Sequence, residues 1–154
     1  MKSKILDEIN SIAKEVYKNL GTGHNEIIYH RAFEVELRTR NIDYSTKAPL
    51  SIYYKGYIVG YSELDIIVYP NADKKEKIIV ELKATTYEPR SAEKAQLCCY
   101  MRSMNCEKGI LINFPQPTSK LNIDIDDIHF IHFGFDVVDV SNITNTSVPI
   151  LHIN

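Results

Sequence analysis

Cysteine is scarce in this sequence, and the few cysteines present do not form a recognisable metal or disulfide pattern. Cys98, Cys99 and Cys106 include no Cys-x-x-Cys pair, and their number is odd. A disulfide framework or a structural zinc site needs more cysteines at regular spacing. The sequence therefore indicates a reducing compartment, and we expect all three thiols to be small buried side chains.

Long apolar runs and an excess of positive charge are also lacking. No apolar stretch is long enough to cross a bilayer, and none reads as a signal peptide, so we expect a soluble intracellular protein that is not secreted. The formal net charge is −2, and the sequence after Gly109 contains five aspartates but a single lysine or arginine, Lys120. This charge balance argues against a strong overall field that would attract nucleic acid.

The pattern of apolar residues predicts one mixed domain that spans residues 1–154. Helical spacing of apolar residues covers 3–20, 25–40 and 92–105, with glycines after the first helix and Ser91 as a candidate N-cap of the third. Runs typical of strands cover 44–48, 50–54, 57–60, 63–68, 78–84, 109–114 and 129–135. The order predicts an α/β (α+β) fold with a mixed sheet, one face of which is covered by helices.

The most informative stretch, residues 63–83, reads as two strands joined by a turn rich in Pro, Asn and Asp. If this hairpin is symmetrical about Asp73, Asp65 lies opposite Glu81, and Glu63 lies opposite Lys83. Alternation predicts that Ile79, Glu81 and Lys83 share one face of the second strand. In the first strand, alternation places Leu64, Ile66 and Val68 on one face, and Glu63, Asp65 and Ile67 on the other.

Two carboxylates at this spacing favour a divalent cation between them. Their repulsion is about 1 kcal/mol in water and larger in a partly buried site. Mg²⁺ takes oxygen ligands, and Lys83 could then stabilise an attacking hydroxide or the charge that develops at phosphorus. The alternative is a solvated face with a Glu63–Lys83 pair, worth about 0.2–1 kcal/mol. On these residues alone the alternative is favoured, because structural ion pairs outnumber active sites.

Two further groups of polar residues lie on helices. Gln96 and Tyr100 are four residues apart and therefore share a helix face, from which both could reach a phosphate or a water. Their structural interpretation is a rim amide and a core aromatic. Glu26, near the start of the second helix, is already favoured there by the helix dipole.

Taken together, these motifs resemble the PD-(D/E)XK nuclease superfamily, and specifically its small GxxExxY family in the RecB-like and lambda-exonuclease-like branch. The family's name motif is present as Gly23-His-Asn-Glu26-Ile-Ile-Tyr29. The other similar stretches follow in order: Tyr53-Tyr54-Lys55-Gly56, Asp65 in an apolar strand, Val80-Glu81-Leu82-Lys83-Ala84, Ala95-Gln96-Leu97 with Tyr100, and Gly109-Ile-Leu-Ile-Asn-Phe114. The resemblance covers about residues 5–115, and 116–154 then form a C-terminal extension of the same domain.

The resemblance implies a restriction-endonuclease-like core and a specific set of site residues. It makes Asp65 and Glu81 the metal-binding carboxylates, Lys83 the catalytic lysine, and Glu26 the upstream acidic metal ligand on the first core helix. It also matches Gln96 and Tyr100 to the Gln-x-x-x-Tyr motif. These six residues are the expected catalytic set.

The implied reaction is Mg²⁺-dependent hydrolysis of phosphodiester bonds in DNA, with Mn²⁺ as a substitute metal, in DNA repair or recombination. The protein would then be cytoplasmic or located with the DNA. Iron–sulfur members of the RecB-like branch use four cysteines, so no cluster is expected here.

Two other interpretations stay open at this point. A catalytically inactive nuclease fold could bind DNA or a protein partner, although the intact Asp65, Glu81 and Lys83 set argues against it. Tyrosine is enriched at protein interfaces, so the tyrosines at 53, 54 and 57 could form a homodimer contact.

Overall fold

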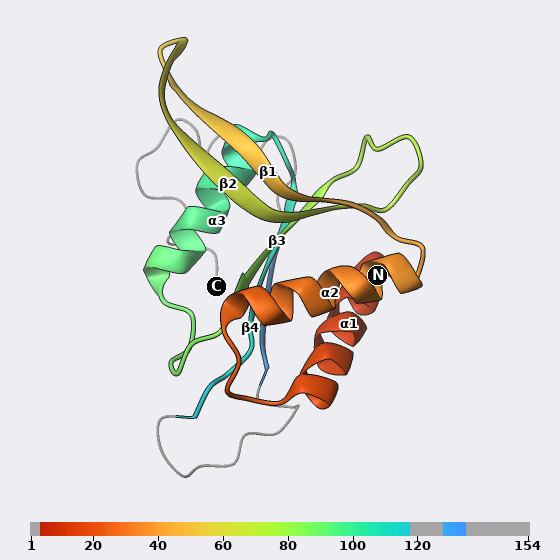
Figure 1. Ribbon diagram of the computed structural model, residues 1–154. Helices are drawn as coiled ribbons and strands as arrows, with labels where there is room; N and C mark the ends of the chain where they lie inside the picture. Colours follow the sequence, from red (N-terminus) through yellow and green to blue (C-terminus); the bar gives the residue numbers. More distant parts are fainter. Residues whose placement is uncertain (1–3, 118–127, 135–154) are drawn as a thin grey trace.

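The computed structural model describes residues 4–117 and 128–134, which form a five-stranded sheet with three helices (Figure 1). The elements follow the order α1 (Lys4–Leu20), α2 (Glu26–Thr39), β1 (Asp43–Tyr54), β2 (Tyr57–Tyr69), β3 (Ile78–Lys83), α3 (Ser91–Ser103), β4 (Lys108–Asn113) and β5 (His129–Gly134). The strands lie side by side in the order β1-β2-β3-β4-β5. Only β3 and β4 are parallel, and the other neighbours are antiparallel. The mixed α/β sheet is therefore confirmed.

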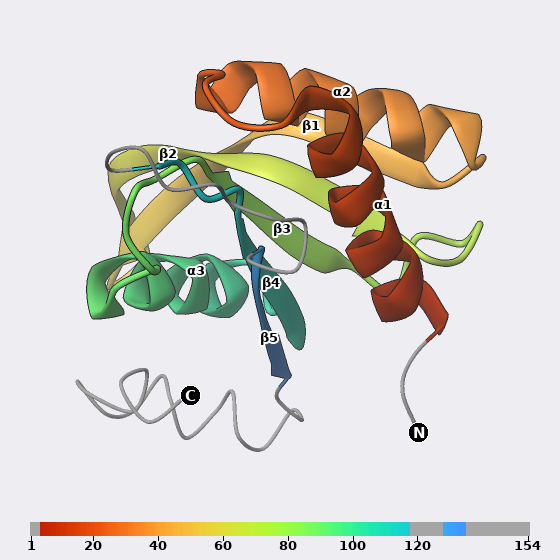
Figure 2. The same ribbon diagram turned by 90° about the horizontal axis from the view of Figure 1, so that it is seen from below.

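Both faces of the sheet are covered, which corrects the expectation of one covered face. Helices α1 and α2 lie on one side and α3 lies on the other (Figure 2). Val80 and Leu82 pack with the first two helices, whereas Ile79 and Leu111 pack with α3. A strand buried on both sides needs a continuous apolar run rather than alternation, and Ile78–Leu82 has that run apart from Glu81.

The start of α2 is held in place by contacts between distant parts of the chain. Gly21 ends α1 with a φ of 66°, a left-handed conformation that glycine adopts without strain. The Tyr29 hydroxyl donates to the Gly21 carbonyl at 2.7 Å and accepts from the Gln116 amide at 2.9 Å. Its ring stacks on Phe114, just after β4, with centroids 4.7 Å apart. These contacts fix the first turn of α2 beside the ends of β3 and β4.

Strands β1 and β2 are each continuous, where the sequence had indicated shorter strands. Pro49 lies within β1, an edge strand, where a residue without an N–H donor is tolerated. Pairing between β2 and β3 covers only Ile66–Val68 with Ile78–Val80. The rest of the β1–β2 hairpin therefore projects away from the body of the molecule (Figure 1).

A backbone irregularity lies in β1, opposite Asp65. Lys47 has a φ of 52°, and the regular β1–β2 register omits the Lys47–Asp65 pair. Leu64 packs in the cluster under α3, whereas Ile66 packs in the cluster under α1 and α2. The prediction that Leu64 and Ile66 share a face is therefore wrong, because the strands change faces at this point.

Helix α3 differs from the prediction in two ways: which residue is its N-cap, and the exposure of one of its cysteines. Arg90 is the N-cap residue and Ser91 is the first helical residue, and the Arg90 N–H donates to Glu93 Oε2 at 2.8 Å. Cys98 is buried as expected, but Cys99 is exposed. Within the described ranges, no helix is long and apolar enough to cross a membrane.

Candidate active site

The two carboxylates predicted to face each other meet where the β2–β3 ladder ends. The register pairs Ile66 with Val80, which confirms the hairpin symmetry about Asp73. Beyond that pair, side chains replace backbone carbonyls as acceptors. The Asp65 N–H donates to Glu81 Oε1 at 3.2 Å, and the Leu82 N–H donates to Asp65 Oδ2 at 2.9 Å. Each strand thus orients the carboxylate of the other.

Glu81 is the most strongly perturbed acid of this pair. Only 6% of its surface is exposed. Burial, and then the negative charge of Asp65, raise the pKa of Glu81 to about 8, against the lowering effects of the Asp65 N–H and Lys83. Glu81 therefore holds a proton at neutral pH in the absence of a cation.

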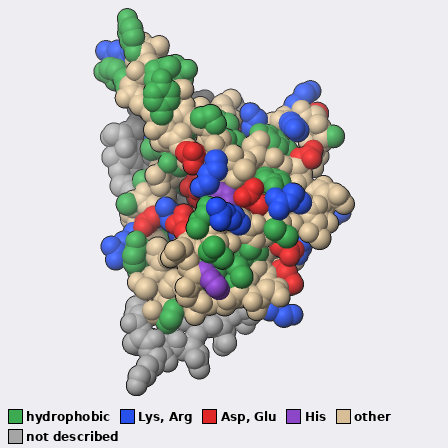
Figure 3. Space-filling view, viewed as in Figure 1, with side chains coloured by type: hydrophobic (Ala, Val, Ile, Leu, Met, Phe, Trp, Pro, Cys, Tyr) green, Lys and Arg blue, Asp and Glu red, His purple; other side chains and the backbone are tan. Residues whose placement is uncertain are grey.

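Lys83 and Glu26 bring two more charges to the same place. Lys83 ends β3 and lies two residues after Glu81, so the two share one side of the strand. Glu26 is the first residue of α2, and most of its surface is open to solvent. Partial desolvation raises the pKa of its carboxyl; Lys83 opposes this rise and Asp65 adds to it. Figure 3 shows acidic, basic and histidine side chains mixed on this face, between the hairpin and α2.

The segment after Lys83 is tied to β4 by a buried amide. Asn113 is fully buried, and its Oδ1 accepts hydrogen bonds from the Thr85 N–H and the Thr85 hydroxyl, both at 3.0 Å. The Phe114 N–H donates to the Lys83 carbonyl at 2.8 Å. Lys83 is therefore held at a fixed point of the sheet.

His30 is a buried site residue that the sequence interpretation missed. Its Nε2 lies 2.7 Å from Thr46 Oγ1, and that hydroxyl donates to the Asp65 carbonyl at 3.3 Å. Thr46 has one proton to donate, so this network assigns the Nε2–H donor form to His30. Burial lowers the pKa of His30, which favours the neutral ring. Its spacing of four residues from Glu26 on one helix was the available signal.

Lys47 is the second missed residue, and it corrects the expected partner of Glu63. Lys47 Nζ lies 3.8 Å from Glu63 Oε1 across the β1–β2 ladder. Glu63 thus pairs with Lys47 and not with Lys83, because the β2–β3 ladder has already ended. The positive charge of Lys47 also lowers the pKa values of Glu26 and His30, which places it at the site.

Comparison with known proteins agrees with this arrangement. A family model described as the PD-(D/E)XK nuclease superfamily matches residues 3–124. The chain belongs to the PD-(D/E)XK nuclease superfamily. Glu81-Leu82-Lys83 has the form of the (D/E)XK part of the superfamily's name, and the Asp65 N–H donates to Glu81.

A solved structure supports the same fold. The crystal structure of SSO0001 is similar to the whole of this chain and to 79% of its own, with 18% identity and a TM-score of 0.52. Comparison with curated proteins gave no match. The superfamily fold is therefore shown by both the family model and the architecture, while the site roles depend on the geometry.

The Gln-x-x-x-Tyr pair expected of some superfamily members lies on α3, which covers the opposite sheet face from α1 and α2. Tyr100 is buried in the core under α3, and Gln96 is exposed on the same helix. Within residues 4–117 and 128–134, no hydrogen bond joins either side chain to Asp65, Glu81 or Lys83. The first turn of α3 is close enough to Lys83 for their charges to interact. Desolvation would raise the pKa of Glu93, but hydrogen bonds from the N–H groups of Glu93 and Arg90, together with the charge of Lys83, lower it.

The donor set fits a divalent cation at Asp65 and Glu81. Among the described residues no three His, Cys, Asp or Glu side chains are arranged to hold a metal ion. Mg²⁺ is nevertheless commonly held by one or two carboxylates, with waters and phosphate oxygens as its other ligands. Two largely desolvated carboxyl groups, of which Glu81 gives up its proton only when a cation compensates the charge, are suited to such an ion.

Proposed function

We propose that this protein is a divalent-metal-dependent nuclease that hydrolyses phosphodiester bonds in DNA. The observation that carries the proposal is the Asp65–Glu81 pair, in which each strand orients the carboxyl group of the other beside Lys83. Nuclease chemistry is the general activity of the superfamily to which the chain belongs. The Gly23–Tyr29 motif supports membership of the GxxExxY family within the RecB-like branch.

The carboxylates would hold Mg²⁺, or Mn²⁺ in its place, after Glu81 has lost its proton. When bound, the cation would neutralise phosphate charge and make a bound water more acidic. Lys83 Nζ would stabilise the negative charge that develops on the phosphate oxygens as water adds to phosphorus. Glu26 would accept a hydrogen bond from the attacking water or share in holding the cation.

Other residues are assigned more peripheral roles in this proposal. Lys47 would add a second positive charge near the scissile phosphate, since it already acts on Glu26 and His30. Gln96 would contact the DNA backbone from the exposed side of α3, while Tyr100 would fix that helix from the core. Residues 116–154 would continue the same domain, as the pairing of β5 with β4 suggests.

The second candidate is an inactive nuclease fold that binds DNA or a protein partner. It is favoured by one observation, namely that no three-ligand metal group occurs in the described part of the chain. The two candidates differ in whether the lysine and the metal matter for turnover. Both candidates have the same fold, and in both DNA could bind at the same surface.

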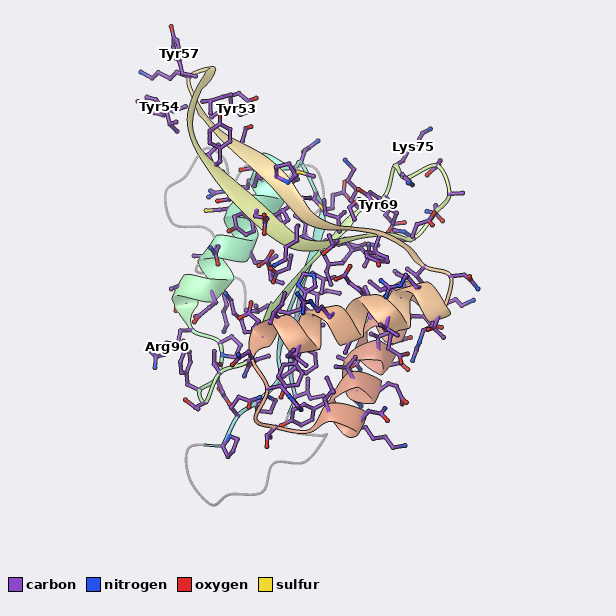
Figure 4. All side chains as sticks on the ribbon, viewed as in Figure 1. Tyr53, Tyr54, Tyr57, Tyr69, Lys75 and Arg90 are labelled. Carbon is purple, nitrogen blue, oxygen red and sulfur yellow. The ribbon has the colours of Figure 1, made fainter. Side chains whose placement is uncertain are left out.

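A cleavage assay separates the two candidates. Purified protein is incubated with single-stranded, linear duplex and closed circular DNA in Mg²⁺, Mn²⁺ or EDTA, beside Lys83→Ala. Lys75→Ala is the matched control, because Lys75 lies in the β2–β3 loop away from the site (Figure 4). Metal-dependent cleavage that Lys83→Ala abolishes and Lys75→Ala retains supports the nuclease. No cleavage under any condition, or equal cleavage by Lys83→Ala, favours the binding module.

A further inference from the structure

The tip of the β1–β2 hairpin exposes an unusual concentration of large apolar and aromatic side chains. Tyr57 is 76% exposed and Tyr61 is 75% exposed. The other exposed members of this tip are Tyr53, Tyr54, Ile58 and Val59. Figure 4 shows the labelled tyrosines 53, 54 and 57 at the end of the hairpin that is farthest from α1 and α2. Such a patch marks an interaction site rather than random exposure.

The tip also contains a tight turn and a positive charge. Lys55 and Gly56 have φ values of 50° and 83°, the pattern of a two-residue turn that follows the twist of the strands. Tyr54 and Tyr57 are direct partners across the ladder, so their rings share one face beside that turn. Lys55 Nζ lies 5.4 Å from the centre of the Tyr54 ring. From Tyr44 to Ser62 the chain contains two lysines and no acidic residue, although its net charge is −2.

One face of the hairpin leads from the tip to the carboxylates. Leu50 and Leu64 pack under α3, so Tyr61 and Glu63 occupy the opposite face of β2. Glu63 contacts Lys47 and acts on His30, which places this face at the site. Tyr53 shares this face with Tyr61, whereas the register shift between Ile52 and Tyr53 leaves Tyr54 and Tyr57 on the face of Leu50. At a rise of about 3.3 Å per residue, Tyr61 lies about 13 Å from Asp65 along β2, and Ile58, the partner of Tyr53, about 23 Å. These distances are a few nucleotides of an extended strand.

We propose that the β1–β2 hairpin is a stacking platform for the unpaired bases of single-stranded nucleic acid, which it guides to Asp65 and Glu81. The proposal rests on the proposed nuclease function and adds a substrate class to it. Exposed aromatic rings stack on bases of any sequence, and a lysine among them contacts the phosphates. A second copy of the chain fits less well, because two tips would bring their Lys55 side chains together with no acid between Tyr44 and Ser62 to pair with them.

Binding in the absence of cleavage tests this assignment. A fluorescein-labelled oligothymidylate and a duplex of the same length are titrated with protein in EDTA, and fluorescence anisotropy gives the two Kd values. The Tyr53→Ala/Tyr61→Ala double variant removes two exposed rings on the face that leads to the site, and Tyr53→Phe/Tyr61→Phe keeps them. Val35→Ala, an exposed apolar residue on α2, is the control for surface truncation. Circular dichroism checks that each variant is folded.

The expected result is that the alanine pair weakens single-strand binding by at least about tenfold. The phenylalanine pair and Val35→Ala should stay within about threefold of the unmodified protein, and duplex binding should change less than single-strand binding. Because the chain has no tryptophan, base stacking should also quench its tyrosine fluorescence, and the alanine pair should reduce that quenching.

Several results would overturn the proposal. Single-strand binding that is unchanged in the alanine pair, or absent in the unmodified protein, removes the platform. Sedimentation that shows a dimer converted to a monomer by the alanine pair, with DNA binding retained, assigns the tip to a second copy instead. Metal-dependent duplex cleavage without single-strand binding would leave the nuclease function intact. Tyrosine-dependent binding without cleavage would leave the platform intact and contradict the nuclease function.

Discussion

Replacing Glu81 by glutamine is expected to stabilise the metal-free protein while it abolishes metal binding. The pKa of the Glu81 carboxyl is raised to about 8 in the folded chain, whereas the unfolded chain keeps the ordinary value of 4.5. Between these two values the folded chain keeps a proton that the unfolded chain releases. The unfolded state is therefore favoured as the pH rises through this window, and the free energy of unfolding falls until about pH 8.

The size of this effect follows from the same two pKa values. Each pH unit between the two pKa values is worth about 1.4 kcal/mol. The free energy of unfolding is therefore about 3 kcal/mol lower at pH 7 than at low pH, where Glu81 is protonated in both states. Glutamine is neutral at every pH, its Oε1 still accepts from the Asp65 N–H, and its amide donates to the Asp65 carboxylate. We expect Glu81→Gln to raise the free energy of unfolding by about 2–3 kcal/mol at pH 7. Below about pH 4 the two proteins should be equally stable.

Urea unfolding in EDTA over a range of pH values measures this difference. Glu63→Gln is the control, because the Glu63 side chain is 60% exposed and its loss should change stability little at any pH. In Mg²⁺ or Mn²⁺ the unmodified protein should gain stability and Glu81→Gln should not. A Glu81→Gln variant that is less stable at pH 7, or a difference that does not change with pH, would refute the reasoning.

Three other perturbations test particular contacts. Gly109→Ala should lower stability by about 1–3 kcal/mol in thermal denaturation, because the added methyl group meets the Met101 side chain at the α3–β4 contact; an unchanged melting temperature would show that this contact yields freely. Native protein should react with a thiol reagent at exposed Cys99 and not at Cys98, whose pKa burial raises to about 12, and mass spectrometry of the labelled protein would reveal the opposite pattern if this account is wrong. Asn113→Ala should cost about 1–3 kcal/mol in urea unfolding and slow cleavage, since it leaves a backbone donor near Lys83 unpaired; full activity would contradict that role.

Local sequence signals predicted the elements and the key register well. Helices α1, α2 and α3 begin and end within a few residues of their predicted limits, since each has a clear apolar stripe. The pairing of Asp65 with Glu81 followed from a turn centred on Asp73, because a hairpin fixes which residues lie opposite each other. The carboxylate pair could therefore be found from the sequence alone.

Features that depend on tertiary packing could not be predicted in the same way. Covering of both sheet faces buries Ile67 and Ile79, and only the unbroken apolar run of β3 hinted at it. The shift of Leu64 to the α3 side follows from left-handed backbone at Lys47, a conformation that lysine rarely adopts and that no local pattern indicates. The pairing of Glu63 with Lys47 depends on that same irregular part of the β1–β2 hairpin.

The central claim is that Asp65 and Glu81 hold a divalent cation beside Lys83. Calorimetric titration of Mn²⁺ at pH 8, with and without a DNA oligonucleotide, tests it most directly in the unmodified protein, Asp65→Asn and Glu63→Gln. The unmodified protein and Glu63→Gln should bind Mn²⁺ alike, Asp65→Asn should not bind it, and binding should weaken as the pH falls below the pKa of Glu81, about 8. Equal Mn²⁺ binding by Asp65→Asn, or no binding by the unmodified protein even with DNA present, would contradict the claim.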